Sequence, residues 1–104
     1  MPSKATITRR RWRLYLLQDG ICFYCKQPMT LHPGSPSIPT RVTVDHLVPL
    51  SQGGRRGYTN EVAACHGCNS KRGTRDWIAF YTEKAEERGE VVVAAPERPG
   101  LRDS

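Results

Sequence analysis

The sequence contains no long hydrophobic run. The only apolar cluster near its start, Leu14 to Leu17, is flanked by Arg13 and Gln18 and lacks the form of a secretory segment. No stretch approaches the roughly 20 apolar residues that a membrane-spanning helix requires. These absences argue against a secreted or membrane-embedded protein, and we expect a soluble, cytoplasmic one.

Acidic residues are scarce in the first three quarters of the chain. Residues 1–75 carry 12 Lys/Arg but only three acids, a balance of +9, whereas residues 76–104 carry four Lys/Arg against seven acids. A polycation of this strength favours a polyanionic partner, although a basic surface can also serve solubility alone. We expect a polyanion such as nucleic acid as the partner.

No cysteine of the sequence lies outside a C-x-x-C pair, so no odd thiol is left over. The four cysteines form two C-x-x-C pairs, and two such pairs can close one tetrahedral zinc site. A chain of 104 residues buries little apolar surface, so a structural metal would supplement its core. A disulfide framework is the alternative. The predicted ligands of one structural zinc are Cys22, Cys25, Cys65 and Cys68.

The chain is long enough for one domain. We expect a flexible arm over residues 1–7, a folded domain over residues 8–89 and a disordered tail over residues 90–104. Four prolines make residues 28–40 a loop, in which His32 is interpreted as a surface residue. The sequence shows no internal repeat apart from the two cysteine pairs.

Local signals place short elements around the cysteine pairs. Helices are expected from about Arg9 to Gln18 and over residues 75–88, and a strand over residues 41–46. The segment from Glu61 to Ala64 is interpreted as a short helix, with Glu61 as a charge in its first turn. The second long helix carries an aromatic stripe, which we expect to pack against Trp12 and Leu16.

The residues between and beside the cysteine pairs suit phosphodiester hydrolysis. His46 is a natural general base near neutral pH, and Asp45 and Asn69 offer hard oxygen ligands for Mg²⁺ or Mn²⁺. A zinc staple would bring these three residues together. Adjacent residues on a regular strand point to opposite faces, so the strand must end or bulge for Asp45 and His46 to share a site.

Basic side chains near this candidate site are expected to contact DNA phosphates. Arginines in the first turn of a helix oppose its dipole, and phosphate contact would explain them. The alternative for these arginines, and for Arg55 and Arg56 at the glycine-rich turn, is that they are exposed to solvent and do not contact DNA. The predicted phosphate contacts are Lys71, Arg72, Arg75, Arg9, Arg10, Arg11, Arg55 and Arg56.

The order of these motifs resembles that of HNH endonucleases of the ββα-metal type. The resemblance is carried by the run from Asp45 to Gly54, then Asn60, then Cys65-x-x-Cys68-Asn69, and it extends over about residues 9–75. It implies a small α+β fold. In this fold a hairpin-plus-helix motif is stapled by a four-cysteine zinc site and flanked by an N-terminal and a C-terminal helix.

The resemblance also implies roles for individual residues. His46 corresponds to the general base, Asp45 to a metal ligand, Asn60 to the residue that bridges the hairpin and steadies the base, and Asn69 to the last metal ligand. Asn69 stands where histidine is common in the family, which makes an H-N-N variant and favours hard ions. The implied reaction is single-strand hydrolysis, that is, cleavage of one strand, which leaves 5′-phosphate and 3′-hydroxyl ends and needs no ATP.

Together these features predict a metal-dependent endonuclease whose partner is double-stranded DNA, which it nicks. No helix carries a spaced set of base-reading residues, so weak sequence preference is expected. One alternative is a zinc-stapled DNA-binding module without catalysis. Another is a zinc-ribbon module that binds protein, which predicts no salt-dependent DNA affinity. The small size favours an origin in a phage or mobile element, by analogy alone.

Overall fold

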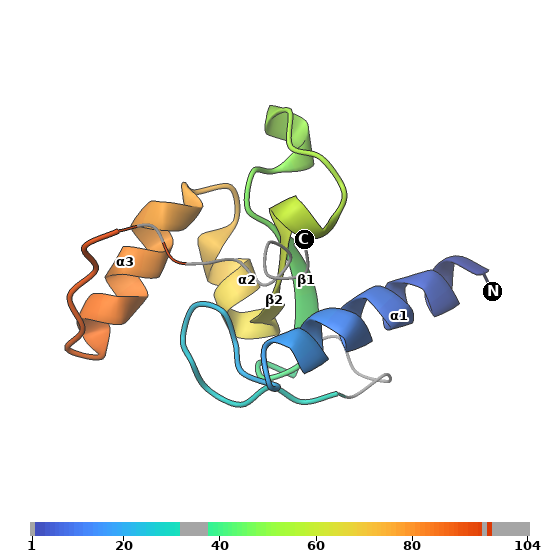
Figure 1. Ribbon diagram of the computed structural model, residues 1–104, viewed down its shortest axis with the longest axis horizontal. Helices are drawn as coiled ribbons and strands as arrows, with labels where there is room; N and C mark the ends of the chain where they lie inside the picture. Colours follow the sequence, from blue (N-terminus) through green and yellow to red (C-terminus); the bar gives the residue numbers. More distant parts are fainter. Residues whose placement is uncertain (1, 32–37, 95, 97–104) are drawn as a thin grey trace.

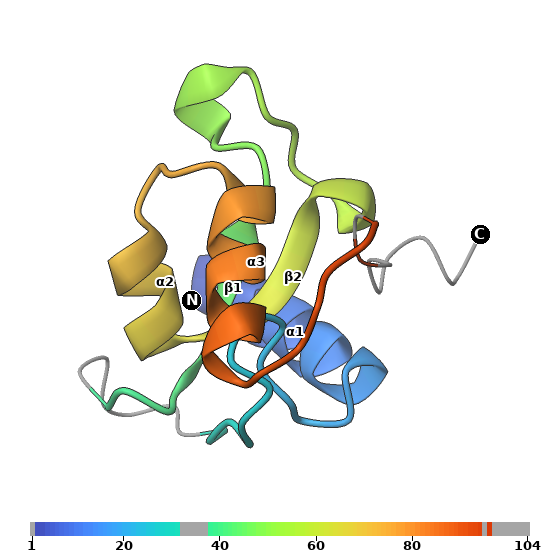
Figure 2. The ribbon, with the colours of Figure 1, turned by 90° about the vertical axis from the view of Figure 1, so that its left-hand side faces the viewer.

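The computed structural model describes residues 2–31, 38–94 and 96, with backbone alone for residues 2–8 and 58. A two-stranded hairpin lies between one helix on one side and two helices on the other (Figure 1), and the view turned by 90° shows the same layering (Figure 2). This confirms the small α+β fold with a hairpin-plus-helix motif. The elements are α1 (Pro2–Leu17), β1 (Val42–His46), β2 (Glu61–Cys65), α2 (His66–Arg72) and α3 (Trp77–Glu87), with 3-10 turns at Leu50–Gln52 and Tyr58–Asn60.

The hairpin positions the candidate site. Strands β1 and β2 pair antiparallel, from Val42 opposite Cys65 to His46 opposite Glu61. The outer edge of β2 is covered by Gln18 of the loop after α1. The Gln18 amide nitrogen donates to the Ala63 carbonyl at 2.9 Å, and its oxygen accepts from the Ala63 N–H at 2.8 Å. A side chain thus takes the place of a third strand, so this buried backbone keeps its hydrogen bonds.

The expectation of a short helix over Glu61–Ala64 is wrong, because this segment is β2. Val62, Ala63 and Ala64 are all completely buried, so the strand lacks the alternation of polar and apolar residues that marks a half-exposed strand. Alanine favours helix in isolation, but pairing with β1 and burial on both faces outweigh a preference of less than about 1 kcal/mol per residue.

Helix α1 begins earlier than expected. It starts at Pro2 rather than near Arg9, so most of the segment predicted to be a flexible arm is helical. Proline is common in the first turn of a helix, where its missing N–H has no partner to lose. Leu14 is completely buried and anchors α1 to the domain, whereas Trp12 and Leu16 are 50% and 55% exposed.

Helix α3 forms where its sequence pattern predicts it. Asp76 caps the helix by accepting a hydrogen bond from the Ala79 N–H at 3.0 Å. Its aromatic face packs against the first cysteine pair, with ring centroids 5.0 Å apart for Tyr24 and Phe80 and 5.2 Å apart for Phe23 and Tyr81. The expected packing of this face against Trp12 and Leu16 is therefore wrong.

The proline-rich loop and the tail are described only in part. Residues 32–37, with His32, and residues 95 and 97–104 lie outside the described residues. The two ends of the loop are joined, because the Thr30 N–H donates to the Thr40 carbonyl at 2.7 Å and the Val42 N–H donates to the Thr30 carbonyl at 2.9 Å. Within the described parts of the chain, no helix is long and apolar enough to cross a membrane.

Candidate active site and metal centre

The four cysteine sulfurs form one compact cluster. All of them lie within 4.8 Å of one another, and the Cys25 and Cys65 sulfurs are 3.9 Å apart. Zinc–sulfur bonds of about 2.3 Å in a tetrahedron place sulfurs about 3.8 Å apart. A disulfide requires about 2.05 Å, and all four cysteines are free. The cluster is positioned to bind a single metal ion and fits a structural zinc.

Electrostatics of the cluster also favour a cation. Hydrogen bonds from the Cys22 and Cys68 thiols lower the pKa of Cys65 to about 3, whereas hydrogen bonding to Cys22 and Cys65 raises the pKa of Cys68. The crowded sulfurs therefore share protons rather than ionise together. A bound divalent ion would allow all four to become thiolates.

The second cysteine pair connects the cluster to the candidate site. The Cys65 N–H donates to the Cys22 sulfur and the Cys68 N–H donates to the Cys65 sulfur, both at 3.4 Å. Cys65 thus ends β2 and caps α2. Helix α2 is held against the hairpin as a result, and it carries Asn69 and Arg72 next to β1.

Asp45 is buried in a network of donors on the α2 side of the hairpin. The Tyr24 hydroxyl donates to Asp45 Oδ2 at 2.6 Å, and Arg72 Nη1 lies 3.0 Å from Oδ1 and 2.9 Å from Oδ2. Burial raises the pKa of the Asp45 carboxyl, and the hydrogen bonds from Tyr24 and Arg72 oppose that rise. The Asp45 carboxyl group thus lies directly against the Arg72 guanidinium.

Arg72 is an internal residue and does not lie on the DNA-facing surface. It is 1% exposed, and besides Asp45 its guanidinium donates to the carbonyls of His46 at 2.8 Å, of Arg75 at 2.8 Å and of Leu47. The prediction that Arg72 contacts DNA phosphates is therefore wrong. Its planar group with several N–H donors ties α2 to the end of β1 instead.

His46 lies on the other face of β1 from the Asp45 carboxylate. Its Nε2 is 3.1 Å from Oε2 of Glu61, and its side chain is 23% exposed. Glu61 is completely buried, and the same oxygen is 3.3 Å from Arg10 Nη1 and accepts the Gly57 N–H at 3.2 Å. Glu61 is therefore not a helix-turn charge. Recognising β2 as a strand would have placed it opposite His46.

A hollow of about 260 Å³ brings the predicted residues together. Its lining includes Asp45, His46 and Asn69, together with Val44, Pro49, Leu50 and Gly73. Strand β1 ends at His46 and the chain turns at Pro49, so residues from neighbouring positions of the strand meet in one pocket. The pocket is thus lined by residues that carry a carboxyl, an imidazole and an amide group.

The oxygen donors of this pocket fit a weakly held divalent ion. The Asn69 amide nitrogen donates to Thr43 Oγ1 at 2.9 Å, so the amide oxygen is the atom that could meet a cation. Asp45 Oδ1 accepts from Arg72 within the described residues, and a carboxylate oxygen can accept more than one contact. Arg72 reduces the net charge that Asp45 offers to a cation.

Comparison with known families gives a match to the HNH endonuclease model over residues 22–75. This segment is more than half of the chain. The chain belongs to the HNH endonuclease family. The family is generally one of nucleases, with some non-catalytic members, so the match indicates a nuclease or DNA-binding function. No curated protein matches the chain.

Within the HNH domain, Asn60 holds the loop that follows His46. Its side-chain oxygen accepts the Val48 N–H at 2.9 Å, and its nitrogen donates to the carbonyls of Val48 at 2.9 Å and of Arg55 at 2.8 Å. All three hydrogen bonds go to backbone groups of the loop rather than to His46. Asn60 is therefore a positioning residue.

The remaining predicted phosphate contacts differ in their surroundings. Arg75 is exposed but lies in an ion pair with Glu83. Arg10 is partly buried against Glu61, and Arg11 lies near Arg41, where burial and that neighbouring charge lower the pKa of Arg11. The exposed members of the set, in addition to Arg75, are Lys71, Arg9, Arg55 and Arg56.

Proposed function

We propose that the chain is a metal-dependent DNA endonuclease in which His46 is the general base. The observation that carries this proposal is the pocket of the HNH domain lined by His46, Asp45 and Asn69. The net positive charge of residues 1–75 and the exposed Lys71, Arg55 and Arg56 within that domain support DNA as the substrate.

In this proposal His46 removes a proton from the water that attacks the scissile phosphate. With Nε2 beside the Glu61 carboxylate, Nδ1 is the nitrogen left to accept that proton. The resulting imidazolium is stabilised by the same carboxylate. General-base catalysis of this kind contributes about 10²–10⁴-fold in rate.

Asp45 and Asn69 would hold a divalent ion, Mg²⁺ or Mn²⁺, which supplies positive charge to the phosphoryl and leaving oxygens. The exposed Lys and Arg residues grip flanking phosphates and keep the strand in the pocket. The products are a 5′-phosphate and a 3′-hydroxyl. One such site per chain suits nicking, and α2, with seven residues, is too short to read many bases, so weak sequence preference is proposed.

A second candidate function is a zinc-stapled DNA-binding module without catalysis. The commitment of both Asp45 oxygens to Arg72, and of Oδ2 also to Tyr24, favours this reading, because it weakens the carboxylate as a metal ligand. Such a module has no use for an imidazole held at the pocket by a buried glutamate. We therefore rank the nuclease first.

Nicking of supercoiled plasmid by zinc-loaded protein tests the proposal. Mg²⁺ or Mn²⁺ is added or omitted, since a strong chelator would also remove zinc. His46→Ala is expected to lose at least about 100-fold in nicking rate, with zinc content and DNA affinity unchanged. His66→Ala, a second histidine outside the pocket, is the matched control and should nick like wild type.

Two results would count against the nuclease assignment. Equal nicking by wild type and His46→Ala would remove His46 from the mechanism. Salt-dependent DNA binding without nicking in either metal would establish the non-catalytic module instead.

A further inference from the structure

Glu61 is a buried carboxylate whose contacts all converge on one oxygen. Oε2 meets His46 Nε2, Arg10 Nη1 and the Gly57 N–H, whereas Oε1 has no hydrogen-bond partner within the described part of the chain. A buried charge costs several kcal/mol unless it is paired and hydrogen-bonded. The three donors offset that cost, and one of them belongs to the proposed base.

We propose that Glu61 positions His46 by fixing both the orientation and the tautomer of its ring, and that Arg10 of α1 holds Glu61 in place. This inference rests on the proposed role of His46 as general base. Its new content is a glutamate–histidine pair completed by an arginine from outside the family-matched segment, which begins at Cys22.

The backbone register of the hairpin places Glu61 next to His46. His46 and Glu61 are directly opposite one another in the ladder, so their side chains share a face. An ionised carboxylate only accepts hydrogen bonds, so the ring nitrogen that meets it must carry the proton. A neutral imidazole has one such proton, and Nδ1 is then left as the acceptor.

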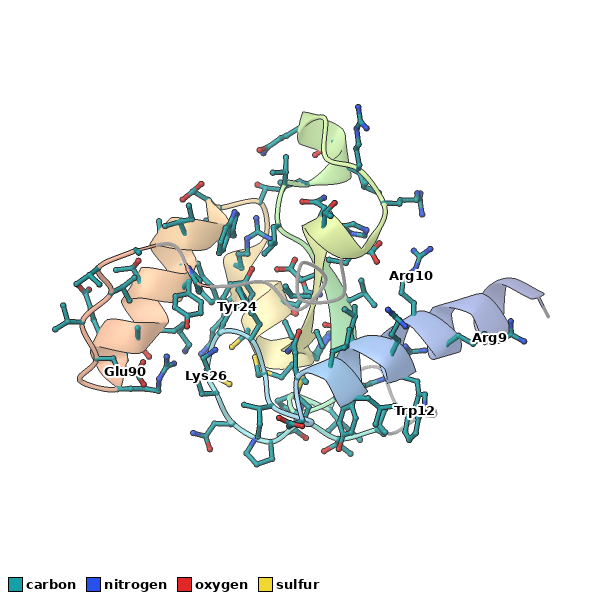
Figure 3. All side chains as sticks on the ribbon, viewed as in Figure 1. Arg9, Arg10, Trp12, Tyr24, Lys26 and Glu90 are labelled. Carbon is teal, nitrogen blue, oxygen red and sulfur yellow. The ribbon has the colours of Figure 1, made fainter. Side chains whose placement is uncertain are left out.

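Arg10 extends this arrangement to the N-terminal helix. Its side chain projects from α1 on the side of the hairpin, whereas Trp12 points away from the opposite side of the helix (Figure 3). The Arg10 side chain is 34% exposed and lies 3.3 Å from Glu61 Oε2. The Arg10 guanidinium therefore places a cation against the same carboxylate oxygen that meets His46.

The test uses the full zinc-loaded chain with Glu61→Gln, Glu61→Ala and Arg10→Gln, and with Glu86→Gln as the control. Glu86 is an exposed glutamate of α3, so its change removes the same charge far from the pocket. Three readouts are needed: the His46 tautomer from nitrogen chemical shifts of the neutral ring, nicking kinetics separated into kcat and KM, and zinc content with thermal unfolding.

The wild-type ring is expected to carry its proton on Nε2. Glu61→Ala should give a mixture of tautomers and lower kcat by about 10–100-fold with little change in KM. Glu61→Gln keeps an oxygen that accepts the Nε2 proton, so it should restore the tautomer and much of kcat. Arg10→Gln should show a smaller loss in kcat, and Glu86→Gln none.

A wild-type ring protonated on Nδ1 would overturn the proposal. A Glu61→Ala variant with wild-type kcat and the wild-type tautomer would overturn it as well. If that variant does not fold, the proposal is overturned when Arg10→Gln keeps wild-type kcat and Glu61→Gln loses the tautomer preference. The tautomer is read without DNA. A failure of the nuclease assignment, seen as full nicking by His46→Ala, is therefore distinguished from a failure of the Glu61–His46 contact.

Discussion

Lys71 and Arg72 are neighbours of the same charge with opposite surroundings. Lys71 is exposed, whereas Arg72 is buried and donates to Asp45 and to the Leu47 carbonyl of the loop after β1. Successive residues of a helix are rotated by about 100°, which turns one side chain toward solvent and the next toward β1. The two positions therefore separate a proposed DNA contact, at Lys71, from a contact that holds the fold, at Arg72.

We predict that Arg72→Lys destabilises the fold by about 3–5 kcal/mol, because a lysine cannot replace the several N–H donors around Asp45. Lys71→Ala should leave stability unchanged and lower DNA affinity, with a decrease of about one in the slope of log affinity against log salt. Denaturant unfolding and DNA titrations over a salt series measure both. A stable Arg72→Lys protein with a reduced salt slope would show that Arg72 faces DNA.

Residue types and spacing in the sequence are enough to indicate some of the residues that line the pocket. Asp45, His46 and Asn69 follow from the motif, and the four cysteines follow from their pairing. The sequence does not indicate which residues the buried charged side chains contact. Arg72 looks like another member of a basic cluster until α2 is rotated into place, and Glu61 has no visible partner until β2 is known to face β1.

The segment between the two strands is an element in its own right. It projects beyond the end of the hairpin (Figure 1) and carries Pro49, the 3-10 turn Leu50–Gln52 and Gly54. The Gly54 N–H donates to the Pro49 carbonyl at 2.9 Å, and a Cβ on Gly54 would lie only 1.7 Å from the Val48 carbonyl oxygen. The loop closes on itself only with glycine at this position.

Gly54→Ala is accordingly predicted to open this loop and to lower nicking by at least about tenfold, at a stability cost of about 1–3 kcal/mol. Gly67→Ala is the control, because its Cβ would lie 3.5 Å from the Pro39 carbonyl oxygen, an ordinary contact, and alanine favours the α2 helix. Plasmid nicking and denaturant unfolding measure the two variants. Equal nicking rates and equal stabilities of the two variants would show that the loop accommodates alanine at position 54 without loss of activity or stability.

Elements with a strong local signal are predictable from the sequence, and elements set by tertiary contacts are not. The cap at Asp76 and the spacing of apolar residues identify α3, and β-branched residues identify β1. Strand β2 is hidden because Val62, Ala63 and Ala64 are buried on both faces. The partner of α3 is hidden too, since Phe23 and Tyr24 belong to an irregular cysteine loop without periodicity.

At the scale of the whole molecule, the cluster of four cysteines brings together segments that are far apart in the sequence. Cys22 and Cys25 follow α1, while Cys65 and Cys68 join β2 to α2. The buried core of the domain surrounds these residues and includes Cys22 and Cys68 themselves. Among the described residues, the hydrogen bonds of the sulfurs are weak contacts with one another and with the N–H groups of Cys65 and Cys68.

Removal of zinc should therefore unfold the domain. Zinc bound by four thiolates contributes on the order of 10–16 kcal/mol in small domains, and the whole stability of a typical domain is about 5–15 kcal/mol. A strong chelator should release one zinc per chain and abolish the helical circular dichroism, and Zn²⁺ but not Mg²⁺ should restore it. Cys68→Ser should reproduce the loss. The opposite result is a metal-free chain that unfolds at the same denaturant midpoint as the zinc-loaded chain. That result would show that the hydrophobic core alone stabilises the fold and that zinc binding does not.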